Sequence, residues 1–182
     1  MVSNKKIVIL GVTGSIAAYK AGDIIRRLKD QGFRVIPVMT KGALQFITPL
    51  TLSSLSEEKV YSDMFSGRVD SWEIEHLDLA KQADILLIAP ATANIIGKIA
   101  NGIADDLLTA VSMATKAPIL IAPAMNTQMY ENKILQDNCT KLKNYGITFL
   151  EPGTGKLACG DIGKGHLANV EDIVKKVAQI VK

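Results

Sequence analysis

The scarcest reactive side chains in this sequence are two cysteines and two histidines: Cys139, Cys159, His76 and His166. A four-cysteine zinc site or an extracellular disulfide framework needs more cysteines, and neither pair has the close spacing of a zinc finger. A lone thiol also needs a partner before it can be catalytic. The surroundings of each residue therefore decide what chemistry it can do.

The two cysteines lie in different settings. Cys159 is in the middle of a loop with five glycines, which predicts a mobile or tightly folded flap at about 152–168. A structural cysteine normally occupies a periodic apolar position, so Cys159 could be catalytic or structural. Cys139 lies within a predicted helix, and we interpret it as structural or incidental.

The histidines are less distinctive. His76 is near the start of a short predicted helix, where a histidine can be a base or simply solvated. His166 lies at the exit of the flap and could contact an anionic substrate or lie on the surface. No His-x-x-x-His, paired carboxylates or Gly-x-Ser-x-Gly is present, so we expect neither a metal site nor serine hydrolysis.

A glycine-containing loop follows the first predicted strand and precedes the first predicted helix. In Gly11-Val-Thr-Gly14-Ser15-Ile16-Ala17, glycines allow a close anion and Ser15 can cap the helix, although a tight connection would read the same. The second predicted strand ends before Thr40 with no carboxylate for a dinucleotide ribose. A mononucleotide is therefore the better prediction.

Short Ile-, Val- and Leu-rich runs alternate with segments of helical period. This pattern predicts an α/β fold, a single Rossmann-like (flavodoxin-like) doubly wound parallel sheet with helices on both faces. The predicted strands are 7–10, 34–38, 85–88, 119–122 and 147–150. The clearest predicted helices are 17–29, 126–145 and one capped by Asn169, with Val170, Ile173, Val174, Val177 and Val181 on one stripe.

Two similar segments, 88–94 and 121–126, each come at the end of a predicted buried strand, and each contains the dipeptide Ala-Pro. Proline cannot donate to a strand ladder, so Pro90 and Pro123 are predicted to end their strands and turn the chain outward. Ligands of open α/β sheets bind in the crevice at that edge. Ala-Pro alone is equally typical of an ordinary turn.

Composition limits the function classes. The 182 residues, 48% of them hydrophobic, predict one domain spanning 1–182. The net charge is 21 − 18 = +3 without basic runs, which gives no footprint for nucleic acid. The apolar runs are too short for a signal peptide or a membrane span. We therefore expect a cytoplasmic protein with no membrane partner.

Several segments together resemble the homo-oligomeric flavin-containing cysteine decarboxylases. They are Gly14-Ser-Ile-Ala-Ala-Tyr-Lys20, His76-Leu-Asp-Leu79, Pro123-Ala-Met-Asn-Thr-Gln-Met-Tyr130 and Ala158-Cys-Gly-Asp-Ile-Gly-Lys-Gly165. The similarity extends from Lys6 to about Ile173. It is strongest to members that convert 4′-phosphopantothenoyl-L-cysteine to 4′-phosphopantetheine and CO2 in coenzyme A biosynthesis.

The resemblance implies FMN as the cofactor and assigns roles to particular residues. His76 would be the base, and Cys159 would supply the proton that completes the product. Substrate contacts would come from Asn126, Met129, Leu157 and Ala158, with Asn126 holding the carboxylate. FMN contacts would come from Gly14, Ser15, Ile16, Ala17, Thr40, Thr92, Ala93, Asn94 and Ala124.

The resemblance also implies partners. It predicts a homotrimer, or a dodecamer built from trimers, with FMN and His76 meeting at a subunit interface. A separate phosphopantothenate-cysteine ligase would supply the substrate. The sequence does not indicate which basic residue binds the substrate phosphate, and Lys164 and Lys156 are candidates only by their place in the flap. Alternatives are a lantibiotic-type peptidyl-cysteine decarboxylase, a non-catalytic regulatory flavoprotein and a flavin prenyltransferase.

Overall fold

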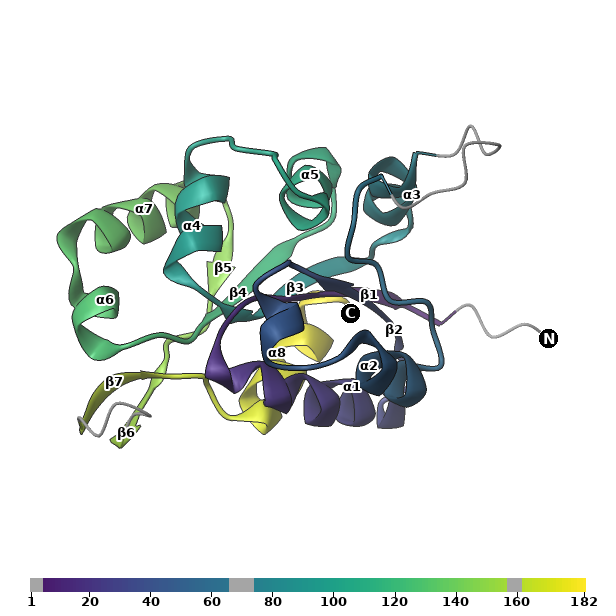
Figure 1. Cartoon of the computed structure of the whole chain (residues 1–182), viewed down its shortest axis with the longest axis horizontal. Helices are drawn as coiled ribbons and strands as arrows, with labels where there is room; N and C mark the ends of the chain where they lie inside the picture. Colours follow the sequence, from purple (N-terminus) through teal and green to yellow (C-terminus); the bar gives the residue numbers. More distant parts are fainter. Residues whose placement is uncertain (1–4, 66–73, 157–161) are drawn as a thin grey trace.

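A five-stranded parallel sheet forms the centre of the molecule. The computed structural model describes residues 5–65, 74–156 and 162–182. Within them the strand order is β2-β1-β3-β4-β5 (Figure 1). The strands are β1 (Ile7–Val12), β2 (Arg34–Met39), β3 (Ile85–Ala91), β4 (Ile119–Pro123) and β5 (Thr148–Phe149). The predicted fold class is confirmed, and the order is that of flavodoxin-like sheets.

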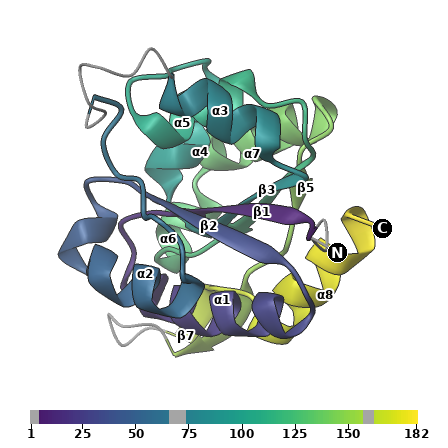
Figure 2. The same cartoon turned by 90° about the vertical axis from the view of Figure 1, so that its right-hand side faces the viewer.

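Helices cover both faces of this sheet, as Figure 2 shows. On one face lie α1 (Ala21–Asp30), α2 (Pro49–Ser56) and α8 (Val170–Ile180). On the other lie α3 (Glu75–Gln82), α4 (Ala93–Ala100), α5 (Leu107–Ala114) and α7 (Lys133–Asn144). Each layer buries its own apolar cluster against the sheet, which explains why the strands lack polar alternation.

In the described residues, three shorter helices each lie between a strand and the longer helix that follows it: the 3-10 helices η1 (Ile16–Lys20) and η2 (Ala43–Gln45), and α6 (Thr127–Glu131). The first predicted helix is therefore not α-helical from its start, because η1 precedes α1. The prediction of a single helix over 126–145 is wrong. Asn132 separates α6 from α7 because its extended backbone ends one helix and its side chain accepts from the Ile134 amide at 2.9 Å.

Two further details differ from the prediction. The third strand does not end before Pro90 but continues to Ala91, with an irregular register between Ile88 and Ala91. Proline interrupts the ladder there without ending the strand, because Ala91 pairs again with Pro123. Asn169 stands at the N-cap of α8, but its side chain makes no capping hydrogen bond.

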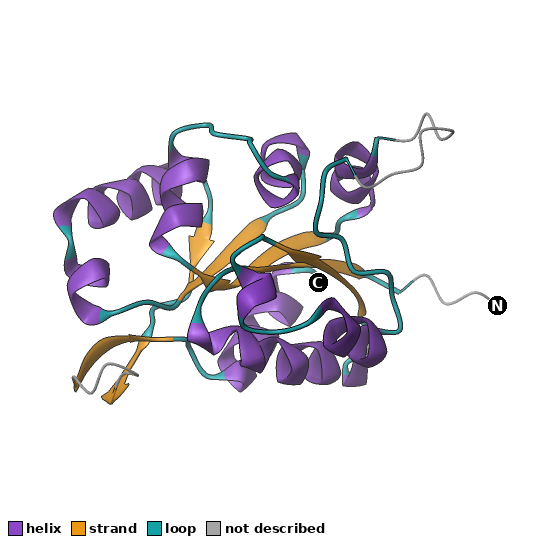
Figure 3. Ribbon diagram, viewed as in Figure 1, coloured by secondary structure: helices purple, strands orange, loops and turns teal. Residues whose placement is uncertain are grey.

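The described parts of the predicted flap form an antiparallel pair of strands, β6 (Gly153–Lys156) and β7 (Ile162–His166). Figure 3 shows this pair extending from the body of the molecule beside α6. Residues 157–161 between the strands are outside the described residues. In the described ranges, no helix has both the length and the apolarity needed to cross a bilayer.

Candidate functional site

A cavity of about 470 Å³ opens at the carboxyl ends of β1, β3 and β4. Its walls come from η1, the start of α4, the turn into α6 and the end of β7. The lining residues are Gly14, Ser15, Ile16, Ala17, Tyr19, Lys20, Thr92, Ala93, Ala124, Met125, Asn126, Met129, Gly165, His166 and Leu167. This is the edge at which open α/β sheets bind ligands, next to the point between β1 and β3 where the strand order reverses.

The loop after β1 is shaped by a glycine and a serine. Ser15 caps η1 as predicted, because its Oγ accepts from the Ala17 amide at 3.3 Å. A Cβ on Gly14 would lie 3.0 Å from the Cα of Gly42, so this glycine lets the loops after β1 and β2 pack together. Thr40 belongs to the second loop, where its Oγ1 accepts from the Ala43 amide at 3.3 Å, and it does not line the cavity.

Thr13 joins two of the cavity loops, although the sequence did not single it out. Its side chain is 1% exposed and donates to the Pro90 carbonyl at 2.7 Å. The same Oγ1 accepts from the Thr92 amide at 3.1 Å. One buried hydroxyl therefore connects the end of β1 to the end of β3. The available signal was a hydroxyl residue at the end of a buried strand, next to Gly14.

The loop after β3 brings in two of its three predicted residues. Thr92 caps α4, with its Oγ1 accepting from the Ile95 amide at 3.4 Å, and Ala93 follows in the cavity wall. Asn94 is exposed and does not line the cavity.

The facing wall contains Ala124, Asn126 and Met129, as expected from the sequence. Asn126 caps α6, because its Oδ1 accepts from the Gln128 amide at 2.8 Å. With Oδ1 held in this way, Nδ2 is the atom of this side chain that can donate to an anionic ligand.

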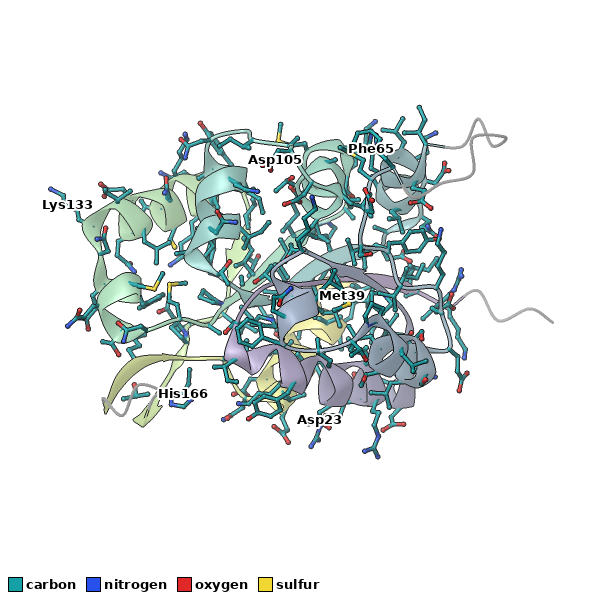
Figure 4. The ribbon with its side chains drawn as sticks, in the orientation of Figure 1. Asp23, Met39, Phe65, Asp105, Lys133 and His166 are labelled. Carbon is teal, nitrogen blue, oxygen red and sulfur yellow. The ribbon has the colours of Figure 1, made fainter. Side chains whose placement is uncertain are left out.

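The charge of the cavity favours an anion. Lys20 supplies a positive charge to its lining, and no Asp or Glu lines it among the described residues. The imidazole of His166 is also in the lining. Figure 4 shows His166 at the end of β7, where a Cβ on Gly155 would lie 3.2 Å from its Nε2. Lys164, a predicted phosphate ligand, instead forms an ion pair with Glu151 at 2.6 Å. The spacing of residues around Lys20 did not indicate that this lysine, rather than another, would line the cavity.

His76, the predicted base, is not among the residues that line this cavity. His76 is half-buried in α3, which packs against α5 and lies away from α6 and β7 (Figures 1 and 2). Its neighbour Glu75 pairs with Lys59 at 2.5 Å. Cys159, Leu157 and Ala158 are outside the described residues.

Cys139 lies on the inner side of α7, where its side chain is 4% exposed. Burial raises the pKa of its thiol, which disfavours the reactive thiolate. A structural role is therefore consistent with its position. In the part of the chain that the structure describes, no three His, Cys, Asp or Glu side chains gather in a way that could hold a metal ion.

Comparison with known proteins gives a consistent family. The family model described as Flavoprotein matches residues 1–182. A probable phosphopantothenoylcysteine decarboxylase of Streptococcus mutans is 46% identical over 96% of this chain and 98% of that protein. The coenzyme A biosynthesis bifunctional protein CoaBC of Bacillus subtilis is 47% identical over 94% of this chain. The match spans only 42% of the Bacillus protein.

Solved structures are similar over nearly the whole chain. A mutant PPC decarboxylase complexed with pantothenoylaminoethenethiol has a TM-score of 0.87 and 35% identity, covering 96% of this chain and 97% of that one. The FMN-binding protein AtHal3 has a TM-score of 0.84 and 36% identity, covering 96% of both chains.

Proposed function

Because this chain belongs to the flavoprotein family, we propose that it decarboxylates 4′-phosphopantothenoyl-L-cysteine to 4′-phosphopantetheine and CO2, with FMN as cofactor. The observation that carries the proposal is the cavity at the β1, β3 and β4 edge. There the Ser15 loop and Asn126 lie in the same enclosure. The full-length match to the Streptococcus relative supports the same reaction.

The residues of the cavity fit a flavin mononucleotide. A volume of about 470 Å³ is within the roughly 300–1,000 Å³ of small-molecule sites. Ala17, Ala93 and Ala124 give the lining small apolar side chains, which suit contact with a flat ring. Gly14 and Ser15 precede η1, where backbone amides and a hydroxyl can hold a phosphate. Of the remaining predicted FMN contacts, Thr40 and Asn94 would need to act from outside the cavity lining.

A bound flavin supplies reversible hydride acceptance, which makes an electron sink beside the carboxylate that leaves. The chain then has to orient substrate and move protons. Asn126 is suited to holding the substrate carboxylate, because a neutral amide orients it without a strong ion pair that would oppose CO2 loss. Met129 and Lys20 lie in the same lining. We propose Lys20, rather than the paired Lys164, for the substrate phosphate.

The proton-transfer residues require a second subunit in this proposal. His76 is the proposed base that removes the thiol proton, yet α3 is not part of this cavity wall. Ile16, Tyr19 and Met129 line the cavity and are 61%, 64% and 50% exposed, which favours contact with another copy. Cys159 is the proposed proton donor to the product. Leu157 and Ala158 are proposed as further substrate contacts.

Product analysis tests the reaction. Purified protein, reconstituted with FMN, is mixed with phosphopantothenoylcysteine and separately with a peptide ending in cysteine. Mass spectrometry should show loss of CO2 from the first substrate. Preferential turnover of the peptide would instead favour a peptidyl-cysteine decarboxylase. Absence of turnover with both substrates would refute the proposal that this protein is a decarboxylase. Cys159→Ser should accumulate the oxidised enethiol product, whereas normal turnover would contradict the role of Cys159.

The oligomer and its setting are also proposals. We expect a homotrimer or a dodecamer built from trimers, and native mass spectrometry of the holoprotein should show one of these. A fully active monomer would contradict the shared site. We further propose that the protein works in the cytoplasm and receives its substrate from a separate phosphopantothenate-cysteine ligase.

A further inference from the structure

Glu151 gathers side chains from three elements at one carboxylate, just beyond β5. Its Oε2 accepts from the Tyr130 hydroxyl at 3.0 Å and from the Lys164 ammonium at 2.6 Å. Its Oε1 lies 3.4 Å from the Lys143 ammonium. These partners belong to α6, β7 and α7 respectively. Lys164 also lies 5.4 Å from the centre of the Tyr130 ring, so the contacts form one closed cluster.

At neutral pH the groups of this cluster are in the protonation states that these contacts require. The hydrogen bond from Lys164 is the main reason why the pKa of Glu151 is lowered, so its carboxylate stays charged to more acidic pH than an ordinary glutamate. Burial, followed by the bond to Glu151, raises the pKa of Tyr130, so its hydroxyl stays protonated and donates. Only the Tyr130 side chain among these is buried.

Two of the three elements that Glu151 connects, α6 and β7, continue directly into the cavity wall. Met129 precedes Tyr130 in α6, and Gly165 follows Lys164 in β7. Between them the Met125 amide donates to the Gly165 carbonyl at 3.0 Å. The backbones approach so closely that a Cβ on Gly163 would overlap the Thr127 side chain, and one on Gly165 would overlap the Met125 carbonyl. Glycines allow α6 and β7 to approach closely, but they have no side chain that could hold the two elements in one relative position.

We propose that Glu151 is a positioning residue for the substrate site. It does not line the cavity, and it acts by holding α6 and β7 in the relation that sets the gap between Asn126 and His166. The charged contacts supply the lateral restraint that the glycines lack. This inference rests on the proposed function, because substrate affinity is one of its readouts.

The kinetic test uses Glu151→Gln in the FMN-loaded protein. Glutamine keeps the shape and an acceptor but loses the charge that Lys164 and Lys143 face. We expect KM for phosphopantothenoylcysteine to rise about tenfold, the equivalent of roughly one charge-assisted hydrogen bond, with kcat within about twofold. Asp105→Asn is the matched control, because it neutralises another exposed carboxylate that a lysine, Lys98, meets at 2.7 Å.

A double variant separates coupling from general destabilisation. Lys164→Met added to Glu151→Gln should raise KM little further, because both changes remove the same contact. An additive increase, or an unchanged KM with only a lower melting temperature, would overturn the positioning role.

A second readout does not depend on catalysis. Hydrogen exchange at the Met125 amide, which bonds to Gly165, should be faster in Glu151→Gln than in the unaltered protein, while β1 and β3 amides keep their protection. Unchanged exchange at Met125 would overturn the inference even if the enzyme is active. Failure of the unaltered protein to release CO2 would refute the proposed function instead, and the exchange result would still decide the restraint.

Discussion

At the scale of single residues, Thr13 has the clearest testable role. Thr13→Val keeps the shape but removes both hydrogen bonds, leaving the Pro90 carbonyl and the Thr92 amide without this partner. A buried polar group that loses its partner costs about 1–3 kcal/mol. Without these bonds the two loops are no longer held together in the free protein, and FMN has to order them when it binds, so FMN affinity should fall about tenfold or more. Fluorescence titration of the apoprotein measures this. Thr13→Ser keeps the hydroxyl and should bind nearly normally, and equal loss in both variants would contradict the argument.

Lys20 is the second residue with a specific expectation. Lys20→Met should raise KM for the phosphorylated substrate about tenfold, because one ammonium–phosphate contact is lost. The dephosphorylated substrate should be affected far less, since it lacks the anion that Lys20 would meet. Steady-state kinetics on both substrates makes the comparison. An equal effect on the two substrates would mean that Lys20 serves the cavity in another way.

At the scale of elements, the contact between β7 and α6 depends on Gly163. Gly163→Ala would bring its new Cβ into the Thr127 side chain and force the two elements apart. We expect a lower melting temperature and a free energy of unfolding reduced by about 1–3 kcal/mol. Gly153→Ala in the same strand pair is the matched control, because its Cβ would make only an ordinary 3.7 Å contact with His166. Similar losses in both would contradict a specific close approach.

The elements also show why some sequence predictions failed. The polar period of 126–145 continues through Asn132, so it predicted one helix, although asparagine is itself a capping residue. Pro90 was expected to end a strand because it lacks a donor, but neighbouring β4 restores pairing at Ala91. In both cases a local signal competed with tertiary contacts that a single sequence does not contain.

At the scale of the whole molecule, acid should weaken the fold. Asp84 accepts from the Ile7 amide at 2.8 Å, the main reason why its pKa is lowered, and it pairs with Lys6. A carboxylate with a lowered folded pKa stabilises fully above its unfolded pKa of about 4, and this stability is lost as the pH falls through the folded value.

Urea unfolding at pH 7 and pH 3 measures that contribution. Asp84→Asn should lower the free energy of unfolding by about 1 kcal/mol at pH 7 and by less at pH 3, because the stabilisation by the charged carboxylate is already reduced below the unfolded pKa of about 4. An equal loss at both values would show that the charge of Asp84 is not involved.

Most of the fold could be predicted because parallel strands buried on both faces leave a simple apolar signal, as in Ile85–Ile88. The loops at the carboxyl edge followed from the same argument, and Ser15 and Asn126 indeed share one cavity. Lys20 and Tyr19 could not be predicted, because η1 brings them to the cavity by a turn without periodicity. His166 was left as either a substrate contact or a surface residue, and β7 brings it to the cavity wall. His76 and the cavity are joined only in the proposed oligomer.

Because Cys139 is buried, the reactivity of its thiol can be used to measure local opening of the protein. Its thiol is covered by the contact of α7 with the sheet and should react with a maleimide only when that helix lifts away. The labelling rate at this one sulfur, followed by peptide mass spectrometry, would therefore report how often the α7 side of the sheet opens. Adding FMN should lower the labelling rate of Cys139, because a ligand that binds the folded state makes opening less frequent.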